Sequence, residues 1–95
     1  MAALLPTTDV VFALGPMKME VIEFTGTVTT TTGTTQTGIS TADTFSTKMV
    51  RPTQVFVQWD SNGGDGSTTS ISGKTITFTN TGVTNQTVRF LVFGF

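Results

Sequence analysis

The fold class is decided by a stretch that reads Thr53-Gln54-Val55-Phe56-Val57-Gln58-Trp59. From Val55 onward, an aliphatic or tryptophan side chain stands at every second position, which is the period of a β-strand with one buried face. The run from Thr75 to Thr79 alternates strictly, with Ile76 and Phe78 pointing one way and three threonines the other. Both runs are therefore predicted to be strands, and Gly73-Lys74 predicts a tight two-residue hairpin connection from a short strand at 67–71 to the second run.

Further strands are predicted on either side of this stretch, at residues 10–14, 17–28 and 88–95. Gly15-Pro16 ends the first of them. Within 17–28 the apolar side changes at Val21-Ile22, which predicts either a β-bulge or a switch of the covering layer, and Gly26 predicts a bend. Residues 88–95 are apolar on both faces. This pattern predicts either a central core strand or a strand with one face against another subunit.

The middle of the chain gives weaker signals. Residues 29–38 contain no apolar side chain and are predicted to form a long, exposed hairpin or arm. Four apolar residues then follow at spacings of 3, 3 and 4, namely Ile39, Ala42, Phe45 and Met49. That spacing permits one short helical turn near 40–48, for which Ser40 is a candidate cap, with an irregular loop as the alternative.

Turn signals recur roughly every 8–14 residues and no long helix is indicated. We therefore expect an all-β fold, a small antiparallel β-sandwich or barrel of about 6–8 strands. Residues 1–95 are predicted to form a single β domain, with 1–9 as an extended N-terminal arm. No secretory signal is expected, because no Lys or Arg precedes Lys18 and Pro6 interrupts the apolar start.

Composition excludes several functional classes. The chain has no Cys and no His, which excludes a disulfide scaffold and a Cys/His zinc site. Five Lys and Arg make no basic stripe, so nucleic acid is not an expected partner. No stretch approaches the roughly 20 apolar residues of a membrane span, so no membrane partner is expected. Charged residues make up only 12%, and threonine, with 23 residues, takes their place.

No catalytic residues and no cofactor are predicted. Proton transfer near neutral pH usually relies on His or on a tuned carboxylate, and no His is present to activate the many hydroxyl groups. Glu20 and Glu23 are three residues apart on a predicted strand and fall on opposite faces unless the bulge lies between them, which is poor spacing for an acid–base pair. We predict that the chain is not an enzyme.

The loop at residues 60–66, which follows the predicted strand ending at Trp59, offers the only candidate cation site in the sequence. Asp60, Asn62 and Asp65 present oxygen atoms, and glycines between them would let the backbone wrap around calcium. The loop lacks the length and closing acidic residue of a helix-flanked calcium loop, so a plain hairpin loop is the simpler interpretation. Trp59 beside this loop is either a core residue or a platform for stacking a sugar.

Several segments together resemble a known family. They are residues 15–21 (GPMKMEV), 24–27 (FTGT), 36–40 (QTGIS), 55–57 (VFV), 73–80 (GKTITFTN) and 88–94 (VRFLVFG). Over most of residues 10–95 the order of these segments resembles small tailed-bacteriophage virion proteins of the capsid decoration, or cement, type. The Thr-rich run 29–37 departs from the family's pattern.

The resemblance implies a β-fold subunit on the capsid exterior of a virion, made in the host cytoplasm. The implied partners are the major capsid protein and copies of the chain itself, with a trimer favoured. The apolar start of the chain and its apolar strands supply the interface candidates Leu4, Leu5, Phe12, Phe93 and Phe95. Two alternatives stay open: another virion component (tail tube, head–tail connector or fibre-associated subunit), and a carbohydrate-binding or adhesive β module that uses Trp59.

Overall fold

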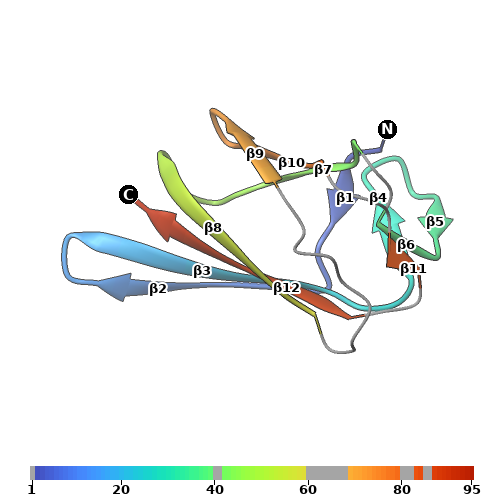
Figure 1. Ribbon diagram of the computed structural model, residues 1–95, viewed down its shortest axis with the longest axis horizontal. Coiled ribbons are helices and arrows are strands. Elements are labelled where there is room, and N and C mark those ends of the chain that lie inside the picture. Colours follow the sequence, from blue (N-terminus) through green and yellow to red (C-terminus); the bar gives the residue numbers. More distant parts are fainter. Residues whose placement is uncertain (1, 40–41, 60–68, 80–82, 85–86) are drawn as a thin grey trace.

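A four-stranded antiparallel sheet, the main sheet, forms one layer of the structure (Figure 1). The computed structural model describes residues 2–39, 42–59, 69–79, 83–84 and 87–95. Within these ranges the only regular structure is β. The main sheet has the order β2-β3-β12-β8, with β2 at Thr8–Leu14, β3 at Met17–Phe24, β12 at Val88–Gly94 and β8 at Pro52–Trp59.

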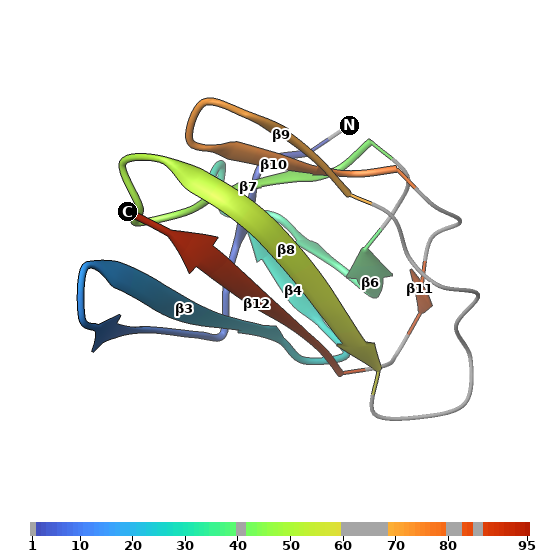
Figure 2. The same ribbon diagram turned by 60° about the vertical axis from the view of Figure 1, so that its left-hand side comes forward.

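Shorter strands form the second layer (Figure 2). One sheet has the order β7-β10-β9, with β7 at Thr44–Ser46, β10 at Thr75–Phe78 and β9 at Thr69–Ser72. Another has the order β1-β4-β5, with β1 at Leu4–Leu5, β4 at Val28–Thr30 and β5 at Thr35–Gln36. The last pair is β11 at Val83–Thr84 with β6 at Gly38–Ile39.

This architecture confirms the predicted fold class. All strand pairs between named strands are antiparallel, and a single isolated parallel bridge between Ala3 and Thr44 joins two of the small sheets. Six of the described strands have four residues or more, and the others are two or three residues long. The result is an all-β fold of the small sandwich type.

The core lies between the two layers and follows directly from alternation. On β3 and β12 the buried side chains are paired by register, with Phe90 opposite Ile22 and Val88 opposite Phe24. Phe45 of β7 meets them from the second layer. Its ring centroid lies 4.7 Å from that of Phe90 and 5.2 Å from that of Phe24, so aromatic contacts connect the layers.

Local turn chemistry places the strands as predicted. Gly15-Pro16 connects β2 to β3, and Gly73-Lys74 connects β9 to β10. Gly15 has φ 65° and Gly73 has φ 60°, which is the left-handed region that a two-residue hairpin requires and glycine adopts without strain. The Thr-rich run forms the β4–β5 hairpin, which is exposed at residues 31–35 and has Thr30 buried. The chain bends at Gly26.

Two features that the sequence allowed are absent from the described residues. The helical turn near 40–48 does not form, because Thr44–Ser46 is strand β7 paired with β10; Ser40 itself lies outside the described residues. Phe45 and Met49 are both buried, but Phe45 enters the core from strand β7 and Met49 from the irregular segment between β7 and β8. The bulge at Val21-Ile22 is also absent. β3 pairs with β12 in unbroken register, and the buried side includes Glu20.

The segment predicted as an N-terminal arm lies against its own chain over the described residues 2–9. Leu4 pairs with Thr30 and is buried, and Thr8 begins strand β2. β12 is the central strand that its sequence allowed, since it lies between β3 and β8. Its inner face carries Phe90 and Val92 into the core, while its other face points away from the second layer.

Candidate assembly surface

The main sheet has a second apolar face, which we call the outer face. Because neighbouring strands are paired in register, side chains that alternate with the core residues share this face. It is formed by Val10, Phe12 and Leu14 of β2, Met17, Met19 and Val21 of β3, Leu91 and Phe93 of β12, and Phe56 of β8.

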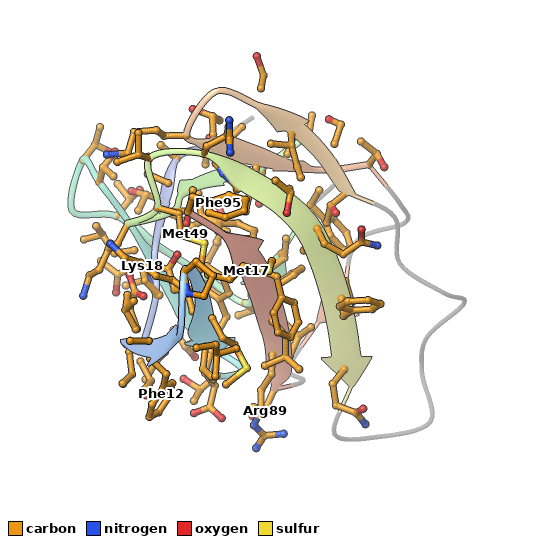
Figure 3. All side chains as sticks on the ribbon, turned by 90° about the vertical axis from the view of Figure 1, so that its left-hand side faces the viewer. Phe12, Met17, Lys18, Met49, Arg89 and Phe95 are labelled. Atoms are coloured by element: carbon orange, nitrogen blue, oxygen red, sulfur yellow. The ribbon has the colours of Figure 1, made fainter. Side chains whose placement is uncertain are left out.

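The outer face is accessible. Phe56 is 52% exposed, Phe12 47%, Leu14 46% and Val10 43%. The described residues place no second layer over it, and Figure 3 shows Phe12 and Arg89 projecting away from the β9–β10 hairpin. One ion pair lies on this face, between Arg89 Nε and Glu23 Oε2 at 2.7 Å. Its exposed apolar side chains make the outer face the candidate interaction surface of the described residues.

The predicted interface residues fall in different places. Phe12 lies on the outer face and Phe93 lies half-buried on it, with its ring 5.8 Å from that of Phe56 in an edge-to-face contact. Leu5 and Phe95 are exposed elsewhere. Leu4 is in the core of its own chain and is therefore not available for an interface.

Three exposed members of the outer face were missed, namely Val10, Leu14 and Phe56. The sequence signal that could have predicted their exposure is a run of apolar residues at consecutive positions, as in residues 88–95. Residues 10–14 are apolar at consecutive positions, so a strand there must expose apolar side chains on at least one face.

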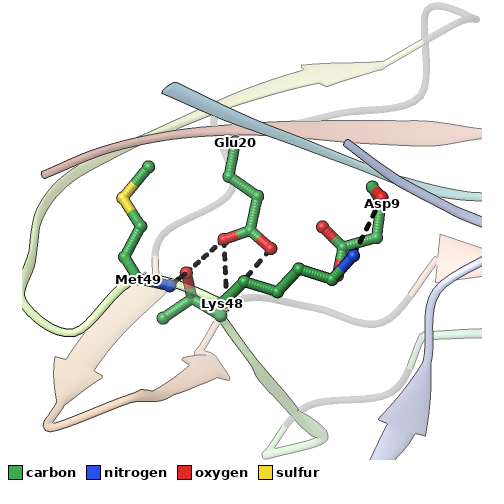
Figure 4. A network of polar contacts seen from close by, with 5 residues as sticks. Asp9, Glu20, Lys48 and Met49 are labelled. Atoms are coloured by element: carbon green, nitrogen blue, oxygen red, sulfur yellow. Dashed lines mark hydrogen bonds and ion pairs between the residues drawn. The ribbon is translucent and has the colours of Figure 1, made fainter. Parts of the chain in front are cut away.

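A buried carboxylate lies on the opposite side of β3 (Figure 4). Glu20 is fully buried, and its carboxylate accepts hydrogen bonds from the Thr47 hydroxyl and from the Lys48 backbone N–H at 3.0 and 3.1 Å. The Thr47 hydroxyl in turn accepts a hydrogen bond from the Met49 N–H at 3.1 Å. These bonds attach the segment before β8 to the main sheet.

Asp9 on β2 lies beside this cluster. Its side chain is 15% exposed, and its Oδ1 atom is buried without a hydrogen-bond partner. Burial, reinforced by the neighbouring Glu20 carboxylate, raises the pKa of Asp9 from 3.8 to about 7, against the opposing effect of Lys48. Lys48 Nζ donates to the Asp9 backbone oxygen at 3.2 Å and lies 3.9 Å from Asp9 Oδ2.

A second buried carboxylate, Asp43, holds the N-terminal segment. Its Oδ1 accepts from the Ala2 N–H at 2.9 Å and its Oδ2 from the Gln36 amide at 2.6 Å. Its backbone oxygen accepts from the Phe78 N–H at 2.9 Å. Glu20 thus joins β3 to the segment that follows β7, and Asp43 joins the N-terminal segment to β5 and β10.

A hollow of about 400 Å³ beside β1 is lined by Asp9 and by hydroxyl side chains that include Thr31, Thr44 and Ser46. Glu20 and Glu23 lie on opposite faces of β3, because the strand has no bulge between them, so their carboxylates do not face each other. Among the described residues, no group of three His, Cys, Asp or Glu side chains is placed to hold a metal ion.

The candidate calcium ligands Asp60, Asn62 and Asp65 lie outside the described residues, as does the side chain of Trp59. In the described part of the chain, no helix has the length and apolar composition that crossing a membrane requires. Comparison of the chain with protein-family models, with curated proteins and with solved structures gives no match.

Proposed function

We propose that this chain is a structural virion subunit that decorates the exterior of a tailed-phage capsid by binding the major capsid protein. The observation that carries the proposal is the outer face, an exposed apolar sheet surface that includes Phe12 and Phe56. The sequence resemblance over residues 10–95 points to the same class of protein. The role requires surface complementarity and no reactive side chains.

The physical basis of such a role is linkage. A subunit that binds the assembled shell more tightly than it binds unassembled capsid protein stabilises the assembled state. The stabilising free energy grows with the free concentration of the subunit relative to its Kd. Apolar surface removed from water supplies the main favourable term of association. A chain with only 12% charged residues carries little charge that would have to be desolvated in tight packing against a shell.

Co-sedimentation tests the proposal. The purified chain is mixed with capsids assembled from the major capsid protein encoded in the same genome, and the pelleted fraction is measured. We expect saturable binding by the natural chain. Phe56→Asp should lower the bound fraction at least about tenfold, because it places a charge in a desolvated contact.

Val50→Asp is the matched control, since Val50 is 77% exposed and does not belong to the outer face. It should bind like the natural chain. Absence of binding by the natural chain, or equal loss in both variants, would contradict the proposal. Binding to purified tails in place of capsids would assign the chain to another part of the virion.

A further inference from the structure

β2 is an edge strand that lacks the usual protection against pairing along residues 10–14, whereas at Asp9 the Lys48 ammonium donates to the backbone oxygen. β2 stands at one end of the main sheet, so the backbone groups along its outer side have no neighbouring strand among the described residues. Proteins commonly block such an edge with a lysine, a proline or a bulge. Residues 10–14 contain no charged residue and no proline, and their register with β3 shows no bulge.

Both faces of β2 are also apolar and exposed. Phe12, on the outer face, is 47% exposed, and Val11, on the other face, is 38% exposed. Another strand added beside β2 would cover side chains on both faces at once and pair the free backbone groups. The edge of β2 therefore offers the unpaired backbone groups and the apolar side chains that pairing with a strand of a neighbouring molecule requires.

The single charge on β2 favours a second copy in one orientation. Antiparallel pairing centred on Val11 places Asp9 opposite Ala13 of the second copy and Val10 opposite its Phe12. Parallel pairing in register would set the two Asp9 side chains next to each other. Apolar cross-strand pairs are stabilising, whereas two adjacent Asp9 carboxylates repel each other once they are ionised, so the antiparallel arrangement is favoured.

The other edge of the main sheet is less suited to this pairing. β8 presents Gln54 and Gln58 beside Phe56 on the outer face, and β9 packs close to it. β2 has no such neighbour along 10–14. A two-fold contact through one strand also closes on itself, which is the commonest symmetry of homo-oligomers.

We propose that two copies of this chain pair through the β2 edge, antiparallel about a two-fold axis at Val11. The pairing joins two four-stranded main sheets into one continuous sheet, and the two outer faces become one apolar surface. It is a property of the chain in solution and does not depend on the proposed capsid contact.

Cysteine cross-linking tests the register, because the natural chain has no cysteine. Val11→Cys brings two thiols to directly opposed positions across the axis. It should form disulfide-linked dimers about tenfold faster than Val50→Cys, because pairing raises the effective thiol concentration above that of random collision. Val50 is the more exposed of the two positions, so accessibility alone predicts the reverse order.

A mixed experiment separates this register from other contacts. In this register Thr8 of one copy lies opposite Leu14 of the other, so a mixture of the Thr8→Cys and Leu14→Cys chains should cross-link. Neither variant should cross-link on its own, because the two copies of the same position lie six residues apart along the strand, about 20 Å. Sedimentation of the natural chain should give a dimer. Val11→Lys should give a folded monomer, because it places two ammonium groups opposite each other.

Three results would overturn the proposal. They are a natural chain that stays monomeric at the highest concentration reached, Val11→Cys dimers that form no faster than Val50→Cys dimers, and cross-linking of Thr8→Cys to Gln54→Cys, which would show head-to-tail contact between β2 and β8. Each of these leaves the co-sedimentation test with capsids unaffected, so the two proposals fail separately.

Discussion

Thr47 is the residue on which the buried polar cluster depends. Its hydroxyl donates to Glu20 and accepts from the Met49 N–H, and the residue is only 3% exposed. A buried carboxylate is tolerated in a protein interior only when hydrogen bonds replace its hydration. Thr47 and the Lys48 N–H supply them, 27 and 28 residues away in the sequence.

Thr47→Val should therefore lower the free energy of unfolding by about 1–3 kcal/mol, because it keeps the shape of the side chain and leaves buried polar groups unpaired. Urea unfolding measures the change. Thr53→Val is the matched control. The Thr53 hydroxyl also donates a hydrogen bond, to the Phe93 oxygen at 3.1 Å, but the contact is exposed and its loss should cost less than about 0.5 kcal/mol. Equal effects would contradict the assigned role.

Asp9 makes stability depend on pH in a defined direction. Its pKa is about 7 in the folded chain, raised by burial and by Glu20, and returns to its ordinary acidic value on unfolding. Between about pH 4 and pH 7 the folded chain thus holds a proton that the unfolded chain releases. The contribution of Asp9 to stability is present below about pH 4 and is lost as the pH rises to about 7.

Asp9→Asn should reduce the fall in the free energy of unfolding between about pH 4 and pH 7, because the amide has the shape of the acid and cannot ionise. Thermal unfolding at several pH values across this range measures the pH dependence of stability. Glu23→Gln is the control, since Glu23 lies on the other face of the sheet in its ion pair with Arg89 and should leave the decline in place. A decline that survives in Asp9→Asn would assign it to another group.

At the scale of elements, the end of β12 is fixed by a close backbone approach. The register between β12 and β8 shifts at Phe93/Gly94, and a Cβ atom on Gly94 would lie 2.3 Å from the Arg51 oxygen. Two backbone hydrogen bonds then join Arg51 and Phe95, and the Arg51 guanidinium lies 4.7 Å from the Phe95 ring centroid. Only glycine fits between these contacts.

Gly94→Ala should destabilise the chain by about 1–3 kcal/mol, since backbone must move to make room. Gly73→Asn is a useful comparison. The space around Gly73 is open and asparagine tolerates its left-handed conformation, so the cost should stay below about 1 kcal/mol. Chemical denaturation of both variants checks the order, and a harmless Gly94→Ala would show that this end of β12 can shift freely.

Strands and turns were predictable because their signals are local. The alternation at 75–79 and the Gly73-Lys74 turn each lie within a few residues, and both were confirmed. The bulge predicted at Val21-Ile22 does not form, because the apolar side chains change from the outer to the inner face of a regular strand, with Glu20 on the inner face. The partners that make Glu20 an inward residue belong to a distant segment, which no local pattern reveals.

The surface was only partly predictable for the same reason. An apolar strand must place side chains somewhere, but whether they are covered depends on strands elsewhere in the chain. Phe12 and Phe93 were predicted as interface residues and lie on the outer face, whereas Leu4 is covered by its own chain. The capsid role itself remains a proposal that the co-sedimentation experiment addresses.

At the scale of the whole molecule, the two faces of the main sheet should respond very differently to the same substitution. Phe90 is fully buried and contacts Phe24 and Phe45, so Phe90→Ala should cost about 3–5 kcal/mol, a large fraction of the stability of a domain this small. Phe56→Ala removes an exposed ring and its contact with Phe93, and should cost about 1 kcal/mol. Urea denaturation tests this contrast, and similar losses would contradict the assignment of inside and outside.

The contacts of Phe45 with Phe24 and Phe90 also determine how the molecule opens. Because they connect the two layers, β12 and β10 cannot separate without exposing the whole core, and their amide protons should exchange with solvent only through global unfolding. β2 is bonded on one side only, so its amides should exchange faster through local fraying. In a paired assembly that fraying would stop, and slowed deuterium uptake along residues 10–14 would report the event directly.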